Sequence, residues 1–224
     1  MNVNEIFASV NGEVCAMYQG SLCTFIRLQG CNLKCSYCDT PQAQGNKGKR
    51  MSVDTVFETV QNLGNKNVTI TGGEPLLQLD DLTRLCLKLV NNGNRVSVET
   101  NGSVKLPEDI STDPHYEVWK YVNLVVDYKL PSSEMEDKMF IDNFVNFDYA
   151  SNDFIKFVVG DANDFRKAKS VIRRCKSEYV KFAMSSVSGK LTPEELLSWM
   201  MKEECLKQRG VILNLQLHKI LNVK

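Results

Sequence analysis

The chain has 224 residues, of which 43% are apolar and 24% are charged, and this is the composition of an ordinary globular protein. Lysine plus arginine and aspartate plus glutamate number 27 each, so the formal net charge is zero and points to neither nucleic acid nor an anionic membrane as a partner. The first ten residues include an acid and no long apolar run follows, so we expect no signal peptide, no spanning helix and a cytoplasmic location. In a reducing compartment, the eight cysteines are not expected to form a disulfide framework.

Strands and helices are predicted to alternate along the chain. Short runs of β-branched and aromatic residues predict strands at residues 22–28, 67–71, 95–100, 122–128, 153–160, 179–184 and 211–217. Apolar residues at helical spacing predict helices at residues 52–63, 79–92, 133–147, 164–176 and 191–208. Some helix ends carry their own signals, which are Ser52 as an N-cap, Gly93 after a helix end, and Thr192 with Glu195 as a capping box.

This alternation predicts an α/β fold with a mostly parallel sheet, in one domain of residues 1–224. The strands are short and mostly apolar, as expected for strands covered on both faces. About seven strands suit either an incomplete barrel or an open doubly wound sheet, and in both the chemistry lies at the carboxyl ends of the strands. Polar segments do follow the first four strands, namely a cysteine loop, GGEP, ETNG and DYKLPSS.

Three cysteines lie in the loop after the first predicted strand with the spacing C-x3-C-x2-C, and they are Cys31, Cys35 and Cys38. Structural zinc usually has four Cys or His ligands, and the histidines His115 and His218 are far away in sequence, so one would have to complete the site through space. A redox pair of Cys35 and Cys38 would leave Cys31 without a role. A [4Fe–4S] cluster takes one thiolate per iron, so three thiolates leave one iron open to an exogenous ligand. The cluster therefore explains the number of cysteines best.

The C-x3-C-x2-C loop after an early strand resembles the signature of the radical S-adenosylmethionine (SAM) superfamily, including the aromatic Tyr37 before the third cysteine. The resemblance implies a [4Fe–4S] cluster whose open iron binds SAM. It also implies an incomplete, pared-down (β/α) barrel of about six to seven mostly parallel strands. In such enzymes the cofactor carries the radical chemistry, and the protein positions the reactants and excludes water. Tyr37 and Asp39, on the loop itself, are assigned to the SAM site.

Further polar segments resemble SAM-binding motifs of this superfamily. Two glycines directly after a strand leave backbone groups accessible to a ligand, and TGGEP is similar to the motif that holds the SAM amino group. ETNG resembles the patch for the SAM ribose and carboxylate, while DYKLPSS and VKFAMSS are weaker matches that ordinary surface loops would also explain. The residues assigned to SAM from these segments are Gly72, Gly73, Glu74, Glu99, Thr100, Asn101, Asp127, Lys129, Met184 and Ser185.

Within the superfamily, the chain resembles the 7-carboxy-7-deazaguanine synthase family in the segments NEIFASVNGE, FIRLQGCNLKCSYCDT, TGGEPLLQ and QLHKILNVK. The resemblance covers most of the chain. It implies ring contraction of 6-carboxy-5,6,7,8-tetrahydropterin to 7-carboxy-7-deazaguanine with loss of ammonia, in queuosine biosynthesis, with SAM used catalytically. It also implies a homodimer and a flavodoxin or ferredoxin as electron donor.

The same resemblance assigns residues to the substrate side of the site. Thr40 is expected to bind Mg2+ beside the substrate carboxylate, because Mg2+ prefers oxygen ligands, and its structural alternative is a loop cap. Arg27 suits that carboxylate unless it forms a surface ion pair. Glu13 would accept hydrogen bonds from the aminopyrimidine edge unless it is a solvated acid in a turn. The other residues assigned to the substrate are Val10, Asn11, Gly12, Thr71, His218 and the last residue, Lys224.

The chain departs from the family pattern near the first of these residues. Asn11 stands where the family usually has glutamine, which is one methylene longer, and the glycine that commonly follows the glutamate is missing after Glu13. Two alternatives stay open. One is another small radical SAM enzyme, such as a glycyl-radical enzyme activase that acts on a protein. The other is a non-enzymatic metal-binding or electron-transfer module, which would leave GGEP and ETNG without a purpose.

Overall fold

The described part of the chain is built around one β-sheet of nine strands in the order β3-β1-β2-β4-β5-β6-β7-β8-β9. The computed structural model describes residues 1–107 and 114–223. Each of the seven predicted strands is present, and these strands run parallel to one another. They are β2 Leu22–Leu28, β4 Asn67–Gly72, β5 Arg95–Thr100, β6 Val122–Tyr128, β7 Phe154–Val159, β8 Lys181–Ser186 and the short β9 Ile212–Leu213. The sheet is open, which confirms the pared-down α/β architecture.

Two further strands precede and follow β2 in the chain and were missed by the sequence prediction. β1 (Asn2–Val10) pairs antiparallel with β2, and β3 (Lys49–Arg50) pairs antiparallel with β1. The polar residues Asn2, Asn4 and Glu5 interrupt the apolar pattern of β1, which is mostly half-buried. Pairing with β2 supplies the backbone hydrogen bonds that this weak pattern does not predict.

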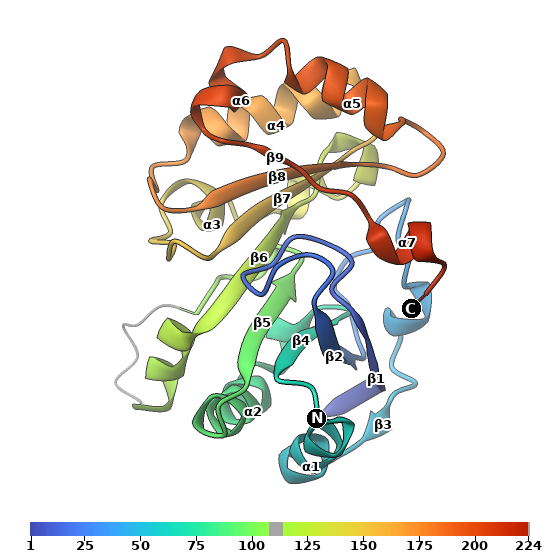
Figure 1. Cartoon of the computed structure of the whole chain (residues 1–224), viewed down its shortest axis with the longest axis vertical. Helices are drawn as coiled ribbons and strands as arrows, with labels where there is room; N and C mark the ends of the chain where they lie inside the picture. Colours follow the sequence, from blue (N-terminus) through green and yellow to red (C-terminus); the bar gives the residue numbers. More distant parts are fainter. Residues whose placement is uncertain (108–113, 224) are drawn as a thin grey trace.

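Helices connect successive parallel strands and cover the sheet (Figure 1). α1 (Val53–Leu63) and α2 (Leu79–Asn91) follow β3 and β4, and α4 (Ala162–Arg174) follows β7. The Ser52 side chain accepts a hydrogen bond from the backbone N–H of Thr55, which confirms the predicted N-cap. The remaining helices are α3 Asp142–Val145, α5 Pro193–Met200, α6 Glu204–Gln208 and α7 Leu217–Leu221, and the 3-10 helices are η1 Pro41–Ala43, η2 Pro75–Gln78, η3 Pro114–Tyr121, η4 Pro131–Ser133 and η5 Glu136–Lys138.

Two predicted helices are wrong in extent. Residues 133–147 form no continuous helix but two short 3-10 turns and the single turn α3. The predicted helix 191–208 is divided into α5 and α6, because Glu203 between them has an extended backbone, with φ −106° and ψ 108°. This break redirects the chain so that Leu206 is buried in the core. The capping box of Thr192 and Glu195 at the start of α5 is present as predicted.

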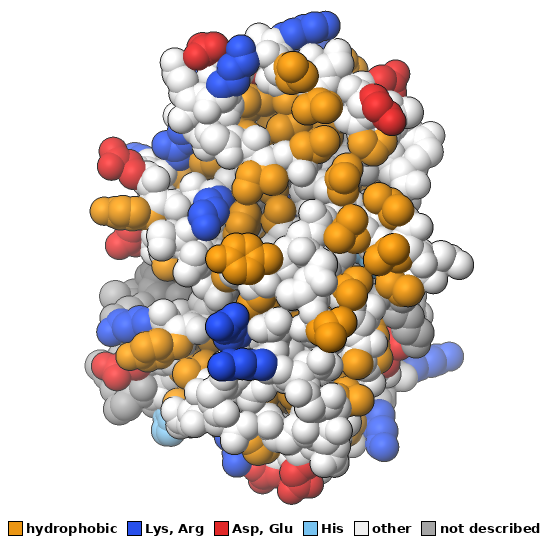
Figure 2. All heavy atoms as spheres, viewed as in Figure 1, with side chains coloured by type: hydrophobic (Ala, Val, Ile, Leu, Met, Phe, Trp, Pro, Cys, Tyr) orange, Lys and Arg blue, Asp and Glu red, His pale blue; other side chains and the backbone are white. Residues whose placement is uncertain are grey.

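The apolar side chains of the strands and covering helices form one large core, and a smaller cluster packs the loop between β1 and β2 against β6, β7 and β8. Other apolar side chains are exposed, and several gather on the face that carries β9 and α7 (Figure 2). These include Ile212, Ile220, Leu221 and Val223. Over the part of the chain that the structure describes, no helix is both long and apolar enough to cross a membrane.

Candidate active site

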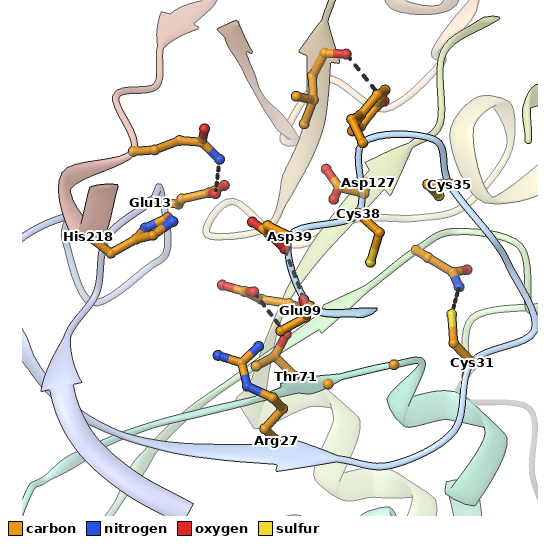
Figure 3. A pocket seen from close by; sticks show the side chains of 18 of the residues that line it. Glu13, Arg27, Cys31, Cys35, Cys38, Asp39, Thr71, Glu99, Asp127 and His218 are labelled. Atoms are coloured by element: carbon orange, nitrogen blue, oxygen red, sulfur yellow. Dashed lines mark hydrogen bonds between the residues drawn. The ribbon is translucent and has the colours of Figure 1, made fainter. Parts of the chain in front are cut away.

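A cavity of about 730 Å3 lies at the carboxyl ends of the parallel strands (Figure 3). Its wall comes from β1, β2, the cysteine loop, β4 to β7, the residues just after β8 and the C-terminal segment. Most of the predicted site residues line it, and they are Val10, Gly12, Glu13, Arg27, Cys31, Cys35, Tyr37, Cys38, Asp39, Thr40, Thr71, Gly72, Gly73, Glu99, Thr100, Asn101, Asp127, Lys129 and His218. Residues from distant parts of the sequence therefore share one site.

The cysteine loop is fixed at its first residue and in its middle by backbone hydrogen bonds. The N–H of Gly30 donates to the carbonyl of Ala43 (2.8 Å), and the carbonyl of Gly30 accepts from the N–H of Glu74 (2.8 Å). Ser36 donates through its N–H to Ser133 (3.1 Å). The loop is thus tied to η1, to the end of β4 and to the segment after β6.

Cys31, Cys35 and Cys38 are free thiols on the cavity wall. Burial raises the pKa of the Cys31 and Cys35 thiols. Among residues 1–107 and 114–223, no three His, Cys, Asp or Glu side chains converge closely enough to hold a single metal ion. The three thiols thus lie on one loop and line one cavity.

Gly72 and Gly73 are required by the close approach of two backbone segments. Gly72 has a φ of 141°, a conformation that residues with a Cβ rarely adopt. A Cβ on Gly73 would overlap the carbonyl of Gly30 and would lie 2.7 Å from the carbonyl oxygen of Ala43. The two glycines thus allow the cysteine loop to pack directly against the end of β4.

The Glu74 carboxylate is fully buried and does not line the cavity. One oxygen accepts hydrogen bonds from Leu76 N–H (2.9 Å) and from the Thr100 hydroxyl (2.7 Å), and the other accepts from Asn101 N–H (2.7 Å). The side chain of Glu74, which the sequence analysis assigned to SAM, thus contacts neighbouring residues of the protein. It connects the ends of β4 and β5 and so holds together TGGEP and ETNG, the two segments that resemble SAM-binding motifs.

Replacing Glu74 with alanine is expected to destabilise the protein by about 3 to 5 kcal/mol, because three buried donors lose their acceptor. Tm should fall by roughly 10 °C for a chain of this size. The exposed acid Glu58 on α1 offers a control. If thermal unfolding of Glu74→Ala matched that of Glu58→Ala, the proposed clamp would be refuted.

Polar side chains of five adjacent strands, β2 and β4 to β7, lie on the face of the sheet that lines the cavity. Because side chains alternate along a strand, residues in register share one face of the sheet. Arg27 on β2 is in register with Thr71 on β4, and Asp127 on β6 is in register with Lys156 on β7. Glu99 on β5 lies between them and accepts a hydrogen bond from the Thr71 hydroxyl (3.1 Å).

Arg27 forms an ion pair and still faces the cavity (Figure 3). Its Nε lies 3.0 Å from the Glu5 carboxylate on β1, and its guanidinium lies 5.6 Å from the centre of the Phe7 ring. These contacts involve one nitrogen of the guanidinium and one of its faces. Its other N–H groups are positioned to bind an anion in the cavity.

Glu13 is a buried acid with a lysine partner. It forms an ion pair with Lys156 and accepts hydrogen bonds from Gln216 (2.9 Å) and Asn214 (3.2 Å). Burial alone would raise the pKa of Glu13, but the positive charge of Lys156 and the hydrogen bonds from Gln216 and Lys156 outweigh it and lower the pKa to about 2. Glu13 is thus not a solvated acid in a turn.

This pKa shift predicts a pH-dependent contribution of Glu13 to stability. Because the pKa of Glu13 is lower in the folded state than its ordinary value of 4.5, the ionised carboxylate stabilises the fold by about 3 kcal/mol above pH 4.5. This stabilisation is lost as the pH falls toward 2. The stability difference between wild type and Glu13→Gln should therefore shrink as the pH is lowered through this window in chemical denaturation. A difference that stays constant between pH 5 and pH 3 would contradict the assignment.

Asp127 lies between two lysines. One carboxylate oxygen accepts from Lys129 Nζ (2.8 Å) and lies 3.6 Å from Lys156 Nζ. The other oxygen is buried and has no hydrogen-bond partner among the described residues. Burial and the nearby carboxylates of Glu13 and Asp127 raise the pKa of Glu99. The floor of the cavity thus holds three carboxylates and two lysines, and one of the carboxylate oxygens has no hydrogen-bond partner among the described residues.

The C-terminal segment closes one side of the cavity. The Leu217 N–H donates to the carbonyl of Gly12 (2.8 Å), and a Cβ on Gly12 would lie 2.9 Å from Cγ of His218. Burial lowers the pKa of His218, although Glu13 and Asp39 oppose the shift. The segment therefore brings His218 beside Glu13, as Figure 3 shows. The predicted contact of Lys224 lies outside the described residues.

The end of the cysteine loop also faces the cavity. The Thr40 hydroxyl donates to a carboxylate oxygen of Asp39 (2.9 Å), and it makes no side-chain cap at the start of η1. The Tyr37 hydroxyl lies 3.5 Å from the carbonyl of Val158 on β7. Two adjacent side chains, Asp39 and Thr40, therefore present oxygen atoms at the same edge of the cavity.

Comparison with known proteins agrees with this arrangement. Residues 25–124 match the family model of the radical SAM superfamily. A 7-carboxy-7-deazaguanine synthase of Clostridium acetobutylicum is 37% identical over 222 residues, which cover 98% of this chain and 95% of the relative. The chain belongs to the 7-carboxy-7-deazaguanine synthase family. A synthase of Koribacter versatilis is 31% identical, with 99% of this chain and 96% of the relative covered.

Solved structures share the fold of this synthase family member. The crystal structure of QueE from Escherichia coli matches with a TM-score of 0.64 and 21% identity, over 96% of this chain and 93% of that chain. SuiB from Streptococcus suis, in its structure bound to S-adenosylmethionine, matches with a TM-score of 0.56 and 15% identity, over 82% of this chain and 47% of that chain. At these identities the likeness concerns the fold.

Three more residues predicted for the synthase site do not line the cavity. The Asn11 side chain is buried, where it donates to the Ser21 hydroxyl (2.8 Å) and accepts from the Thr69 hydroxyl (2.8 Å). Met184 and Ser185 on β8 are buried as well, and Met184 belongs to the main core. Asn11 alternates with the cavity-facing Val10 and Gly12, and β8 instead contributes Val187 and Ser188 beyond its end.

Sequence reasoning missed several residues of the synthase site, of which Lys156 and Gln216 contact Glu13 directly. Lys156 had a signal, since it is the only charged residue in the otherwise apolar stretch FIKFVV. A charged residue is rarely buried in a strand unless it is paired. Gln216 and Glu5 lie in the segments QLHKILNVK and NEIFASVNGE that resemble the family, but their residue types alone did not indicate that they line the cavity.

Proposed function

We propose that the chain catalyses the ring contraction of 6-carboxy-5,6,7,8-tetrahydropterin to 7-carboxy-7-deazaguanine with loss of ammonia. The observation that carries this proposal is the 37% identity to a synthase over nearly the full length of both chains. The cavity supports it, because the cysteine loop and the residues suited to a carboxypterin line the same space. Since the relatives reported above carry the synthase name, the activase alternative is disfavoured.

The radical SAM family implies a [4Fe–4S] cluster and SAM, and the residues of the cavity fit both. Three free thiols on one loop would hold the cluster, which with SAM supplies one-electron radical chemistry when bound. The buried Asp127 oxygen without a partner among the described residues offers an acceptor to a SAM donor group. Gly72, Gly73, Thr100 and Asn101 would contact SAM from the ends of β4 and β5, with their positions set by Glu74.

The substrate side of the cavity would bind an anion at one end and a donor-rich ring at the other. Arg27 would bind the carboxylate of the pterin. We further propose that Thr40 contributes a hydroxyl ligand to a Mg2+ beside this carboxylate, where the neighbouring Asp39 carboxylate supports a cation. Glu13 and His218 would contact the pyrimidine ring, and Thr71 and Glu99 would line the path between ring and SAM.

The proposed enzyme needs partners as well. An external electron donor of the flavodoxin or ferredoxin type would reduce the cluster. We also propose a homodimer, which the exposed apolar side chains on β9 and α7 support, since such side chains commonly mark protein interfaces. A cytoplasmic location would suit both the reduced thiols and such a donor.

One reconstitution experiment tests the proposed function. The cluster is rebuilt without oxygen, and reductant, SAM, Mg2+ and the carboxytetrahydropterin are supplied. The expected product, 7-carboxy-7-deazaguanine, is detected by mass spectrometry, with SAM recovered intact after turnover. An enzyme that cleaves SAM but forms no deazaguanine would overturn the substrate assignment and leave the superfamily membership in place.

A further inference from the structure

Lys156 is a buried cation on the cavity wall that belongs to none of the motifs discussed above. It lies in the middle of β7, between apolar neighbours, and is 6% exposed. Burying an amine without a partner is unfavourable, so the position of its ammonium group is set by the acids around it. Those acids are Glu13, from the loop after β1, Asp127, from β6, and Glu99, from β5.

The distances assign Lys156 chiefly to Glu13. Asp127 already has its own partner, because Lys129 Nζ lies 2.8 Å from the Asp127 carboxylate, whereas Lys156 Nζ is 3.6 Å from it. The contact of Lys156 with Glu13 is shorter than either distance. Lys156 is therefore the counter-ion of Glu13, and Lys129 is that of Asp127.

The hydrogen bonds of Glu13 leave one side of its carboxylate open. Lys156 and Asn214 both donate to Oε2, whereas Gln216 is the one donor to Oε1 (2.9 Å) among the residues that the structure describes. A carboxylate has about four lone-pair sites, so Oε1 retains one acceptor position. Because Glu13 lines the cavity, this position is available to a donor on a bound molecule.

An aminopyrimidinone ring suits such an acceptor. Its edge presents a ring N–H and an exocyclic amine side by side, and an ionised carboxylate accepts hydrogen bonds more strongly than a neutral group. Without a counter-ion, a carboxylate buried at this place would tend to take up a proton and become a donor itself. The orientation and the charge of Glu13 thus both depend on the lysine beside it.

We propose that Lys156 is a positioning residue that holds the Glu13 carboxylate as the acceptor for the aminopyrimidine edge of the pterin. This inference rests on the proposed function. It predicts that Lys156 controls substrate affinity and has little influence on SAM binding, which Lys129 and Asp127 would serve. It also predicts that Lys156 acts only through Glu13.

Substrate affinity is measured in two ways. In the reconstituted enzyme without reductant, the Kd of 6-carboxypterin is followed by fluorescence quenching, which needs no turnover. In the reduced enzyme, KM and kcat are measured with the carboxytetrahydropterin. The variants are Lys156→Met, Lys156→Arg, Glu13→Gln and the double variant. Lys169→Met is the matched control, because Lys169 on α4 is a similarly shielded lysine that pairs with Glu203 away from the cavity.

Lys156→Met is expected to raise both Kd and KM by about 10- to 100-fold, in the range measured for breaking one charged pair, with a much smaller change in kcat. Lys156→Arg should restore part of the affinity, and Lys169→Met should bind like wild type. In the Glu13→Gln background, Lys156→Met should add little, since its partner is already gone. Iron content and SAM binding should stay normal, which separates the effect from misfolding.

Several results would overturn the inference. These are an unchanged Kd in a folded Lys156→Met protein, full additivity with Glu13→Gln, or the absence of saturable 6-carboxypterin binding to wild type. A loss of iron or of SAM binding in both Lys156 variants would also overturn it, because the role would then be structural. Failure of the proposed function is distinguishable, since wild type would then form no deazaguanine whatever residue stands at position 156.

Discussion

Replacing Cys35 with alanine is expected to abolish both the reductive cleavage of SAM and the formation of the deazaguanine. With two thiolates left on the loop, a [4Fe–4S] cluster would lose one of its three protein ligands. Iron and sulfide content, the visible absorbance of the reconstituted protein and the yield of 5′-deoxyadenosine measure this effect. We expect each to fall to background, although the fold should persist because the Cys35 side chain is only partly buried.

A control variant distinguishes the effect of losing a cysteine of the loop from the effect of losing a cysteine elsewhere in the protein. Cys205 is also a half-buried free thiol, but it lies on α6 and does not line the cavity. Cys205→Ala should keep normal iron content and activity. SAM cleavage by Cys35→Ala at the rate of the Cys205 control would contradict the assignment of the loop as the cluster site.

Replacing Gly73 with alanine is expected to lower both the stability of the fold and the binding of the cluster. The added Cβ would overlap the carbonyl of Gly30, which is backbone and cannot swing aside. Either β4 or the cysteine loop must then move. Overpacking of this kind costs about 1 to 3 kcal/mol or more, so Tm should fall by roughly 5 to 10 °C. Displacement of the loop should also lower the iron bound per chain, as measured by elemental analysis.

Gly45 provides a matched control for this variant. It lies in the loop after η1, and a Cβ at this position would meet no atom within 4 Å. Gly45→Ala should therefore leave Tm and iron content close to those of wild type. Equal melting temperatures for the two alanine variants would show that the close approach at Gly73 is not required.

The sequence predicted the strands of this fold because each is a short apolar run bounded by polar or turn-forming residues. It missed β1, whose strand character depends on pairing with β2 rather than on its own pattern. It also extended the helix after β8 through Glu203, because helical periodicity continues there. The break at Glu203 depends on where Leu206 can be buried, and this is a property of the folded core.

The candidate site, like the fold, was predictable from the sequence only in part. The cysteine spacing, the two glycines and the polar strand ends are local patterns, and they are sufficient to predict which segments line the cavity. Asn11 and Glu74 lie within predicted motifs, yet their side chains point into the protein and hold neighbouring segments in place. Sequence motifs identify such residues without distinguishing a ligand contact from a structural one.

The sequence by itself determined the α/β architecture and the cysteine loop, because alternating patterns and close spacing act over a few residues. Only the tertiary structure decided which charges meet in the cavity. Lys156 lies 143 positions after Glu13, and Gln216 lies 60 positions after Lys156, yet the three form one hydrogen-bonded group. The contact of Glu13 with Gln216 follows from the path of the C-terminal segment, which is hydrogen-bonded to Gly12 and Val14. Long-range electrostatics of this kind exists only after the strands have been placed side by side.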